Sequence, residues 1–297
     1  MKFIIGIILA TFTFLNGKAQ DLLPFRADTL WGYRDKQGVV KIEPQFQYAT
    51  KFTGDIAIVA KNDRLGAIDK NNCLIVPFRY EFLSPLDTAE FLFGYQAKYF
   101  GEHIMGVMTK DEKIKIPAEY NYISKYKNTY TVTKDKDSII GKSSIGDVRS
   151  ITRNYGLLGS DGKVLIPSRY HSIRWINDSL VVVDSSYLTD DKKYLKINSA
   201  LFTNIGEQLT GFDYMVLGKF IEGVAKARID NKFGFIYPTG KVAIPIEFEY
   251  CEDFINGYAL IKQGEKWGAI NKNGKIIIEP FKDYQEVKTE LKEKYGR

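Results

Sequence analysis

Short segments of alternating apolar and polar residues recur along the chain between residues 31 and 280. In most copies a bulky residue followed by Gly precedes a turn, and two apolar residues spaced two apart follow that turn. Val40 and Ile42 form this pair in the first copy, and Ile276 and Ile278 form it in the last. A period of two is typical of a half-buried β-strand. The pattern therefore predicts short β-strands throughout the repeated region.

Seven copies of this pattern follow one another, and we call the bulky first residue of each copy its anchor. The anchors are Trp31, Leu65, Met105, Tyr155, Ser199 in a degenerate copy, Phe233 and Trp267. They are separated by 34, 40, 50, 44, 34 and 34 residues, so the unit has about 34 residues with insertions in the central copies. A unit of this size cannot bury its own apolar face, and we expect it to be stabilised largely by its neighbours.

The residue seven positions after the anchor marks the turn. It is Gly in five copies, as at Gly38 and Gly274, and Asn72 in the second copy. Gly and Asn are the residues that best tolerate a positive φ, so this position predicts a hairpin turn. Glu112 occupies it in the third copy and predicts a different turn or local strain.

A Pro follows the apolar pair in six copies, as at Pro44 and Pro280. Because Pro has no N–H to donate, we expect it to end the strand. Two aromatic residues spaced two apart often come next, such as Phe46 and Tyr48, and a third strand precedes the next anchor. Each unit is therefore predicted to be roughly a three-stranded β-meander.

The predicted fold is all-β, with about seven such meanders in tandem forming an open twisted array over residues 20–285. Residues 286–297 are expected to be a charged tail or a short helix. A closed, propeller-like ring is the alternative, because the array starts and ends within a unit. A unit of about 34 residues is short for a four-stranded blade, which favours the open array.

The most regular copy runs from Lys266 to Pro280 with the pattern K-W-G-x-I-x-K-x-G-K-x-I-I-x-P. This motif resembles the bacterial WG-repeat family, and the resemblance covers nearly all of the chain after its first 20 residues. It implies an all-β repeat protein that acts as a binding or interaction module. The family has no common catalytic residues, and only Trp31 and Trp267 keep the Trp of the motif.

The first 19 residues have the features of a cleavable signal peptide. Lys2 precedes an apolar segment from Phe3 to Leu15, and Gly17-Lys18-Ala19 forms a small-x-small cleavage site. We therefore expect a periplasmic or secreted protein, with no transmembrane segment in the mature chain. The net charge of +6 falls by two on cleavage, and this is too small to indicate a nucleic-acid partner.

The cysteines are predicted to remain two separate, half-buried thiols. Cys73 directly follows a turn, whereas Cys251 follows an aromatic pair in a distant copy. A disulfide, which export would permit, forms only if the array brings these unlike positions together.

Few residues have the spacing that catalysis or metal binding requires. His103 and His171 lie 68 residues apart and outside any zinc-binding spacing. Ser124 and Lys127 match the S-x-x-K spacing of Ser–Lys hydrolases, so an exported hydrolase with its site at the central loops is the alternative function. The favoured function is a non-enzymatic binding or scaffold protein without metal or cofactor, and a spacer without ligand is a third possibility.

The hairpin before the anchor is long in the three central copies, where it spans Gly94 to His103, Lys134 to Arg153 and Ser185 to Lys196. Equivalent positions of stacked repeats lie on one side, so these hairpins are predicted to form one binding edge for an envelope protein or a glycan. The candidate ligand-binding residues are Tyr95, Tyr99, Phe100, His103, Lys134, Lys142, Arg153, Tyr187 and Tyr194. Neutral drift in loop length explains the same insertions.

Aromatic residues are abundant, with 19 Phe and 19 Tyr. At repeated positions they are expected to fill the space between units, and a glycan-binding strip is the alternative.

Overall fold

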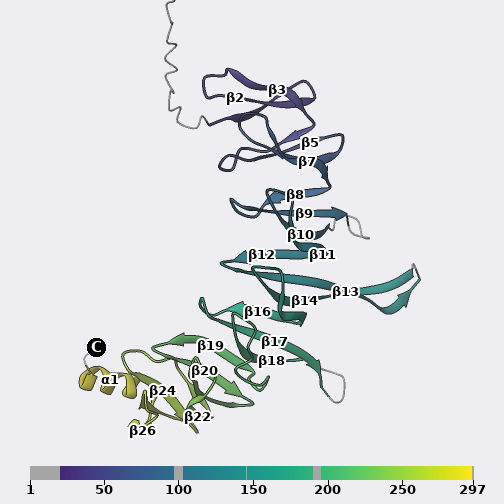
Figure 1. The fold of residues 1–297 in the computed structure, drawn as a ribbon. Helices are drawn as coiled ribbons and strands as arrows, with labels where there is room; N and C mark the ends of the chain where they lie inside the picture. The colour runs from purple at the N-terminus through teal and green to yellow at the C-terminus, as the bar shows by residue number, and fades with distance from the viewer. Residues whose placement is uncertain (1–20, 97–102, 145, 190–194, 296–297) are drawn as a thin grey trace, which may run out of the picture. The chain divides into compact units, whose positions relative to one another are not determined.

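The computed structural model describes residues 21–96, 103–144, 146–189 and 195–295 (Figure 1). These residues form seven sheets and one helix, and the strands of each sheet follow one another in chain order. None of the sheets in these ranges closes into a barrel. The prediction of an all-β protein built from about seven tandem units is confirmed. The predicted signal peptide, residues 1–19, lies outside the described residues.

The first three sheets are numbered here in chain order. Sheet 1 contains β1 (Leu23–Ala27), β2 (Leu30–Arg34) and β3 (Val40–Phe46). Sheet 2 contains β4 (Tyr48–Ala49), β5 (Ala57–Lys61), β6 (Arg64–Ile68) and β7 (Leu74–Tyr80). Sheet 3 contains β8 (Phe82–Pro85), β9 (Glu90–Gln96), β10 (His103–Thr109) and β11 (Ile114–Tyr120).

Four further sheets and the helix follow. Sheet 4 contains β12 (Tyr122–Tyr126), β13 (Thr129–Ser143), β14 (Gly146–Gly159) and β15 (Val164–Tyr170), and sheet 5 contains β16 (Ser172–Trp175), β17 (Leu180–Leu188) and β18 (Leu195–Thr203). Sheet 6 contains β19 (Val216–Ile221), β20 (Val224–Ile229), β21 (Lys232–Ile236) and β22 (Val242–Phe248). Sheet 7 contains β23 (Tyr250–Cys251), β24 (Tyr258–Gln263), β25 (Lys266–Asn271) and β26 (Ile276–Lys282), and α1 (Tyr284–Tyr295) follows it.

The chain divides into two compact units. The first comprises Met1–Tyr95 with Met108–Lys113, and the second comprises Gln96–Val107 with Ile114–Arg297. Sheets 1 and 2 belong to the first unit, sheets 4 to 7 and α1 belong to the second, and the division runs through sheet 3. Each apolar core described below lies within one of these units.

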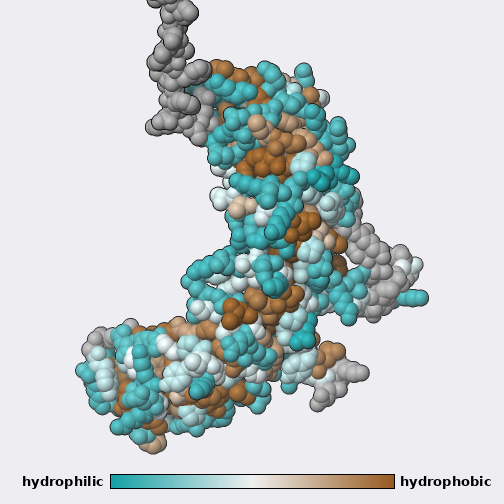
Figure 2. Space-filling model, in the orientation of Figure 1, coloured by the Kyte–Doolittle hydropathy of each residue, from teal (hydrophilic) through white to brown (hydrophobic). Residues whose placement is uncertain are grey.

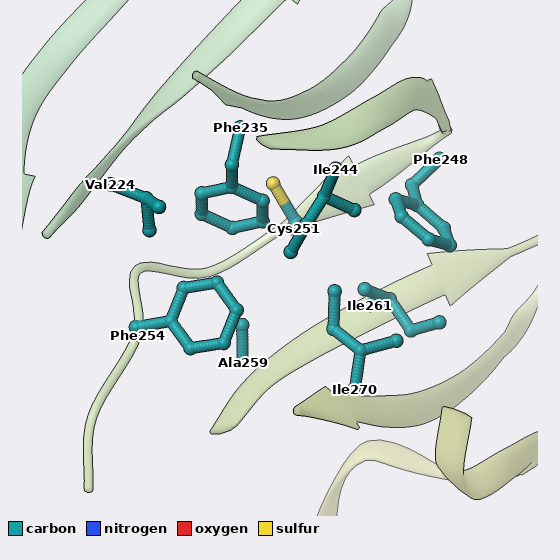
Figure 3. Close-up of a cluster of buried hydrophobic side chains, with 9 residues drawn as sticks. All are labelled: Val224, Phe235, Ile244, Phe248, Cys251, Phe254, Ala259, Ile261 and Ile270. Atoms are coloured by element: carbon teal, nitrogen blue, oxygen red, sulfur yellow. The ribbon is translucent and has the colours of Figure 1, made fainter. Parts of the chain in front are cut away.

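The apolar cores lie between consecutive sheets. Between sheets 6 and 7, Phe235 and Ile244 pack with Cys251 and Ile261 in one buried cluster (Figure 3). Leu260, the neighbour of Ile261 in β24, belongs instead to the cluster that contacts α1. Successive residues of a strand point to opposite faces, so an inner sheet buries side chains against both of its neighbours. This arrangement explains why each repeat is expected to depend on its neighbours for stability.

Helix α1 covers the outer face of sheet 7. Its buried residues Val287 and Leu291 pack with Ala269 and Ile278. Asp283 precedes the helix, and its backbone N–H donates to the Glu286 carboxylate at 2.9 Å. A carboxylate three residues into the helix stabilises the start in this way. The helix begins at Tyr284, two residues before the predicted charged segment.

The turn position has a positive φ in all seven copies, with Gly or Asn in six of them. Glu112 fills it with a φ of 60°, and its backbone N–H donates to the Thr109 carbonyl just as Gly38 donates to Asp35. The third copy therefore has the same turn as the others, and the expectation of a different turn is wrong. The expectation of local strain is correct, because Glu112 has a positive φ without being Gly or Asn. The Glu112 carboxylate accepts hydrogen bonds from Arg79 at 2.7 Å and from the Tyr80 hydroxyl at 3.1 Å.

The strands run through the repeated Pro, so the prediction that Pro ends them is wrong. In sheet 7, Trp267 lies opposite Lys282 and Ala269 lies opposite Ile278, so β26 has two more residues than β25 between these pairs. Pro280 lies in the resulting bulge, where the missing N–H breaks no regular ladder hydrogen bond. The strand resumes beyond it.

This bulge explains the Gly that follows the anchor. A Cβ built on Gly268 would lie 2.5 Å from the Ile278 carbonyl oxygen and 2.9 Å from the Pro280 nitrogen. The bulged backbone therefore occupies the space that a side chain would need. Equivalent backbone clashes would arise at Gly32, Gly66, Gly106, Gly156 and Gly234.

Five of the described sheets have four strands, one more than the pattern predicted. In four of them the additional strand begins at the second residue of the aromatic pair, as at Tyr48 in β4 and Tyr250 in β23, and in sheet 6 it begins at Val216, two residues after Tyr214. The chain therefore passes from one sheet to the next between the two aromatic residues.

Candidate functional site

The candidate site consists of two hairpins that extend beyond the sheets of the second unit. β13 pairs with β12 only up to Thr133, and β14 pairs with β15 only from Tyr155 onward. The residues between these points form a two-stranded ribbon, which we call ribbon A (residues 134–143 and 146–154). β17 and β18 likewise extend beyond β16 as ribbon B (residues 185–188 and 195–198). Both ribbons extend to the same side in Figure 1.

The predicted basic residues of ribbon A are largely neutralised by their neighbours. The Lys134 ammonium lies 3.2 Å from Glu119 and 4.8 Å from the centre of the Tyr120 ring. Arg153 lies 3.2 Å from the Asp135 carboxylate, whose hydrogen bond raises the pKa of the guanidinium. Lys142 is exposed near the end of the ribbon. Because the carboxylates already compensate two of the three charges, ribbon A offers an acidic ligand less than its sequence suggested.

The other predicted site residues are distributed over separate hairpins. Tyr187 lies on ribbon B and is 46% exposed. Tyr95 is the next-to-last residue of β9, is 44% exposed and contacts the ring of Tyr80. His103 begins β10 and is half-buried. Tyr99, Phe100 and Tyr194 lie outside the described residues. Their shared role in one binding edge stays a prediction.

Ribbon B presents apolar side chains that the sequence analysis missed. Leu188 and Leu195 lie opposite each other and are 56% and 57% exposed, and Ile197 is 39% exposed. Figure 2 shows hydrophobic surface where this ribbon extends from the sheet. The sequence shows the alternation of Leu195 and Ile197, but the predicted binding residues of the hairpins were only aromatic and basic. These apolar side chains belong to neither of the apolar cores that pack against sheet 5.

The outer edge of β18 is also open along ribbon B. The N–H groups of Ser199, Leu201 and Thr203 donate away from β17, to residues 214, 210 and 207 respectively. Backbone groups of alternate residues point to the same side of a strand, so those of Leu195 and Ile197 also face outward. β18 is the last strand of its sheet, and no described strand pairs with these two residues on their outer side.

The predicted Ser–Lys pair lies in β12 and the turn that follows it. Ser124 lies in β12 opposite Thr131, and Lys127 lies in the following turn. The Lys127 ammonium forms an ion pair with Asp178, and this hydrogen bond raises the pKa of the lysine. A lysine that acts as a base needs a lowered pKa, so the geometry opposes this role.

In the degenerate fifth copy the anchor takes part in a polar row. The hydroxyls of Ser172 and Ser199 donate to the two oxygens of Asp184 at 2.5 and 2.6 Å, and Arg174 lies 3.6 Å from this carboxylate. Sheet 7 has Tyr250, Lys262 and Trp267 in the corresponding row. Because every polar partner of Asp184 is a neighbouring side chain of the same sheet, the row has a structural role.

The anchors and the second aromatic residues form a continuous line of rings in the last two repeats. Ring centres are 5.4 Å apart for Phe233 and Tyr250, 5.9 Å for Tyr250 and Trp267, and 4.9 Å for Trp267 and Tyr284. The rings are close to perpendicular, the arrangement in which edge and face attract. This line, which we call the aromatic strut, ties sheet 6 to sheet 7 and to α1. The expected packing role of the repeated aromatic residues is confirmed here.

Both cysteines are free thiols, as predicted, but the prediction that they are half-buried is wrong for both. Cys73 is exposed, and Cys251 is buried in the core between sheets 6 and 7. Burial raises the pKa of the Cys251 thiol to about 12.

The described residues contain no group of three His, Cys, Asp or Glu side chains that could hold a metal ion. No helix in these ranges is long and apolar enough to cross a membrane.

Comparison with known proteins identifies the repeat. The WG containing repeat model matches residues 31–64, 233–267 and 267–288, which confirms the resemblance in those regions. No curated protein matches the chain. Among solved structures, the AfRom2 CNH domain is 10% identical and aligns with 89% of this chain and 85% of its own, with a TM-score of 0.21. A similarity this weak supports no conclusion about the fold or function of the present chain.

Proposed function

Because this chain carries WG containing repeats at residues 31–64, 233–267 and 267–288, we propose that it is an exported, non-enzymatic binding or scaffold protein. The sheets supply a rigid support, and ribbons A and B carry the contact surface for a protein of the cell envelope. Long loops on a rigid scaffold are common locations of binding residues.

The exposed apolar face of ribbon B is the observation that carries this proposal. More than half of the surface of Leu188 and of Leu195 is in water, although both are large aliphatic residues. Complete burial of such a side chain is worth about 1.5–3 kcal/mol, and the folded chain does not obtain this at ribbon B. A partner that covers the ribbon would obtain it. Contiguous exposed apolar residues on a soluble protein commonly mark such an interface.

Replacing Leu188 and Leu195 with Ser tests this site. A suitable control replaces Val164 and Val242 with Ser, because these residues are 60% and 53% exposed at strand positions away from the ribbons. Mature protein, residues 20–297, is immobilised and exposed to envelope extract of the source cell. We expect wild type and control to retain the same protein partner and the ribbon variant to retain at least about tenfold less, the factor that corresponds to about 1.4 kcal/mol.

Equal retention by the ribbon variant would contradict a site on ribbon B. Retention of nothing by any of the three proteins would favour the spacer hypothesis.

Export is supported by the composition of the first 19 residues. Cell fractionation with N-terminal sequencing tests it. We expect a mature chain that begins at Gln20 outside the cytoplasm, whereas an intact leader on a cytoplasmic chain would contradict export.

A further inference from the structure

A groove of about 440 Å³ lies between α1 and sheet 7, away from both ribbons. It is lined by Glu252, Asp253, Ile255, Tyr258, Leu260, Lys288, Thr289, Leu291 and Lys292, all in the second unit. Its size falls within the range of about 300–1,000 Å³ that is usual for small-molecule sites. The proposed binding function of the ribbons does not use it.

The floor of the groove is apolar. Leu260 from β24 and Leu291 from α1 are buried there, Tyr258 is half-buried, and Ile255 is 43% exposed at the rim. An apolar floor on two separate elements can hold the hydrocarbon part of a ligand and exclude water from it.

The two acidic residues of the groove already have partners. The Glu252 carboxylate accepts a hydrogen bond from the Tyr284 hydroxyl at 2.9 Å, and Asp253 lies 3.5 Å from the Lys226 ammonium. The Lys226 ammonium partly compensates the charge of Asp253, whereas the neutral Tyr284 hydroxyl occupies one oxygen of Glu252 and leaves its negative charge in place.

The two lysines of the groove differ from their neighbours in this respect. Lys282 and Lys294 form ion pairs with Glu290, whereas Lys288 and Lys292 form no ion pair within the described part of the chain. Lys288 and Lys292 lie four residues apart and so on the same side of α1, both exposed. The two ammonium groups outnumber the one carboxylate without a cationic partner, Glu252, so the balance of charge at the groove is positive.

We propose that this groove binds an amphipathic anion, a small molecule with an apolar body and one anionic head group. The body contacts Leu260, Leu291 and Ile255, and the head group lies near the ammonium groups of Lys288 and Lys292. An ammonium acts as a compact point charge with three donors, which suits a carboxylate or a phosphate head.

Calorimetric titration of mature protein with octanoate, octyl phosphate, octanol and octylammonium tests the proposal. The four probes share the same body and differ in the head group. We expect saturable one-to-one binding of the two anions. Octanol should bind about tenfold more weakly, because it has no charge and cannot form the two partly exposed ion pairs with Lys288 and Lys292. Octylammonium is expected to be weaker than octanol. Tighter binding of one anion than the other assigns the natural head group.

The variant Lys288→Gln with Lys292→Gln is expected to bind octanoate about tenfold more weakly and octanol unchanged, since only the charges are removed. Lys241→Gln with Lys275→Gln removes the same charge outside the groove and should bind like wild type. Ile255→Ala should weaken octanoate and octanol together, and circular dichroism confirms that each variant is folded.

Three results would overturn the proposal. They are an absence of saturable octanoate binding, equal affinities for octanoate and octylammonium, and an equal loss of octanoate binding in the groove and control variants.

Discussion

Replacing Gly268 with Ala is expected to destabilise the last repeat by about 3 kcal/mol. The added methyl group would lie 2.5 Å from the Ile278 oxygen, 2.9 Å from the Pro280 nitrogen and 3.0 Å from the Pro280 Cα. Ordinary Cβ contacts begin at 3.4 Å. The strand β26 would therefore have to move by about 0.9 Å in a tightly packed region.

The magnitude follows from which atoms must move. Overpacking a core costs about 1–3 kcal/mol, and side-chain rotation often relieves part of it. All three atoms near the new methyl group are backbone atoms of β26, so rotation relieves nothing. Moving them also disturbs the pairing of Ala269 with Ile278, which places the cost at the upper end.

Amide hydrogen exchange measured by mass spectrometry is the appropriate assay, because repeat arrays open locally and a global unfolding midpoint averages over the repeats. A loss of about 3 kcal/mol corresponds to exchange about 160-fold faster in peptides that cover residues 266–282. Peptides from sheets 1 and 2 should exchange at the wild-type rate, since repeats interact mainly with their neighbours.

Gly218→Ala in β19 serves as the control, because the nearest atom to its Cβ would lie at 3.3 Å. We expect a change of less than about 0.5 kcal/mol there. Wild-type protection in the Gly268→Ala variant would refute the steric explanation of this glycine. An equal loss in both variants would show that any Ala for Gly exchange in these strands has the same effect.

Three further predictions concern thiols, pH and the aromatic strut. In native protein at pH 8 a thiol reagent should label Cys73 and leave Cys251, whose pKa is about 12, until the chain unfolds; mass spectrometry that finds two labels on native protein would contradict this. The pKa of Asp178 is lowered in the folded chain, so its ion pair with Lys127 stabilises the turn above pH 3.8, and this stabilisation is lost as the pH falls through the lowered pKa. The pKa of Lys127 is raised, so the stabilisation is present below pH 10.5 and is lost as the pH rises through the raised pKa. Corrected exchange protection of residues 126–129 should therefore stay constant from about pH 5 to 9 and decline outside this window, and a loss within it would argue against the ion pair. Tyr250→Ala removes two ring contacts and should reduce the local stability of sheets 6 and 7 by about 1–3 kcal/mol by hydrogen exchange, whereas Tyr237→Ala, outside the strut, should leave it near wild type.

The repeat and its turns were predictable because they depend on backbone geometry that few residues tolerate. A positive φ selects Gly or Asn at the turn, so Gly38 and Asn72 identified it without a structure. The bulge at Pro280 was not predictable in the same way. Proline is compatible with a strand end and with a bulge alike, and only the register of the partner strand distinguishes the two.

The positions of ribbons A and B were predictable and their chemistry only partly, and their role as a binding site stays a prediction. Insertions at equivalent positions of the repeat located ribbons A and B correctly along the chain. Charge compensation could not be predicted. Lys134 pairs with Glu119 and Arg153 pairs with Asp135, and each pair joins different strands whose arrangement the sequence alone does not reveal. The exposure of Leu195 was also hidden, because alternating apolar residues usually indicate a buried face.

The degenerate motif of the fifth copy explains why sheet 5 has no fourth strand. Ala200 stands where the other copies have Gly after the anchor, and the segment after its turn forms only isolated bridges to β18, at Ser199 and Phe202. A bulged partner strand leaves no room for a Cβ at this position, as the close backbone contacts of Gly268 show. Without a fourth strand, β18 is the edge strand of its sheet. The backbone N–H of Leu201 donates to the Thr210 hydroxyl instead of to a backbone carbonyl of a neighbouring strand. Loss of the glycine and loss of the fourth strand thus have one steric cause. The open edge of ribbon B has another, because the ribbon precedes the anchor, and even in sheet 4 the fourth strand pairs only from its anchor Tyr155 onward.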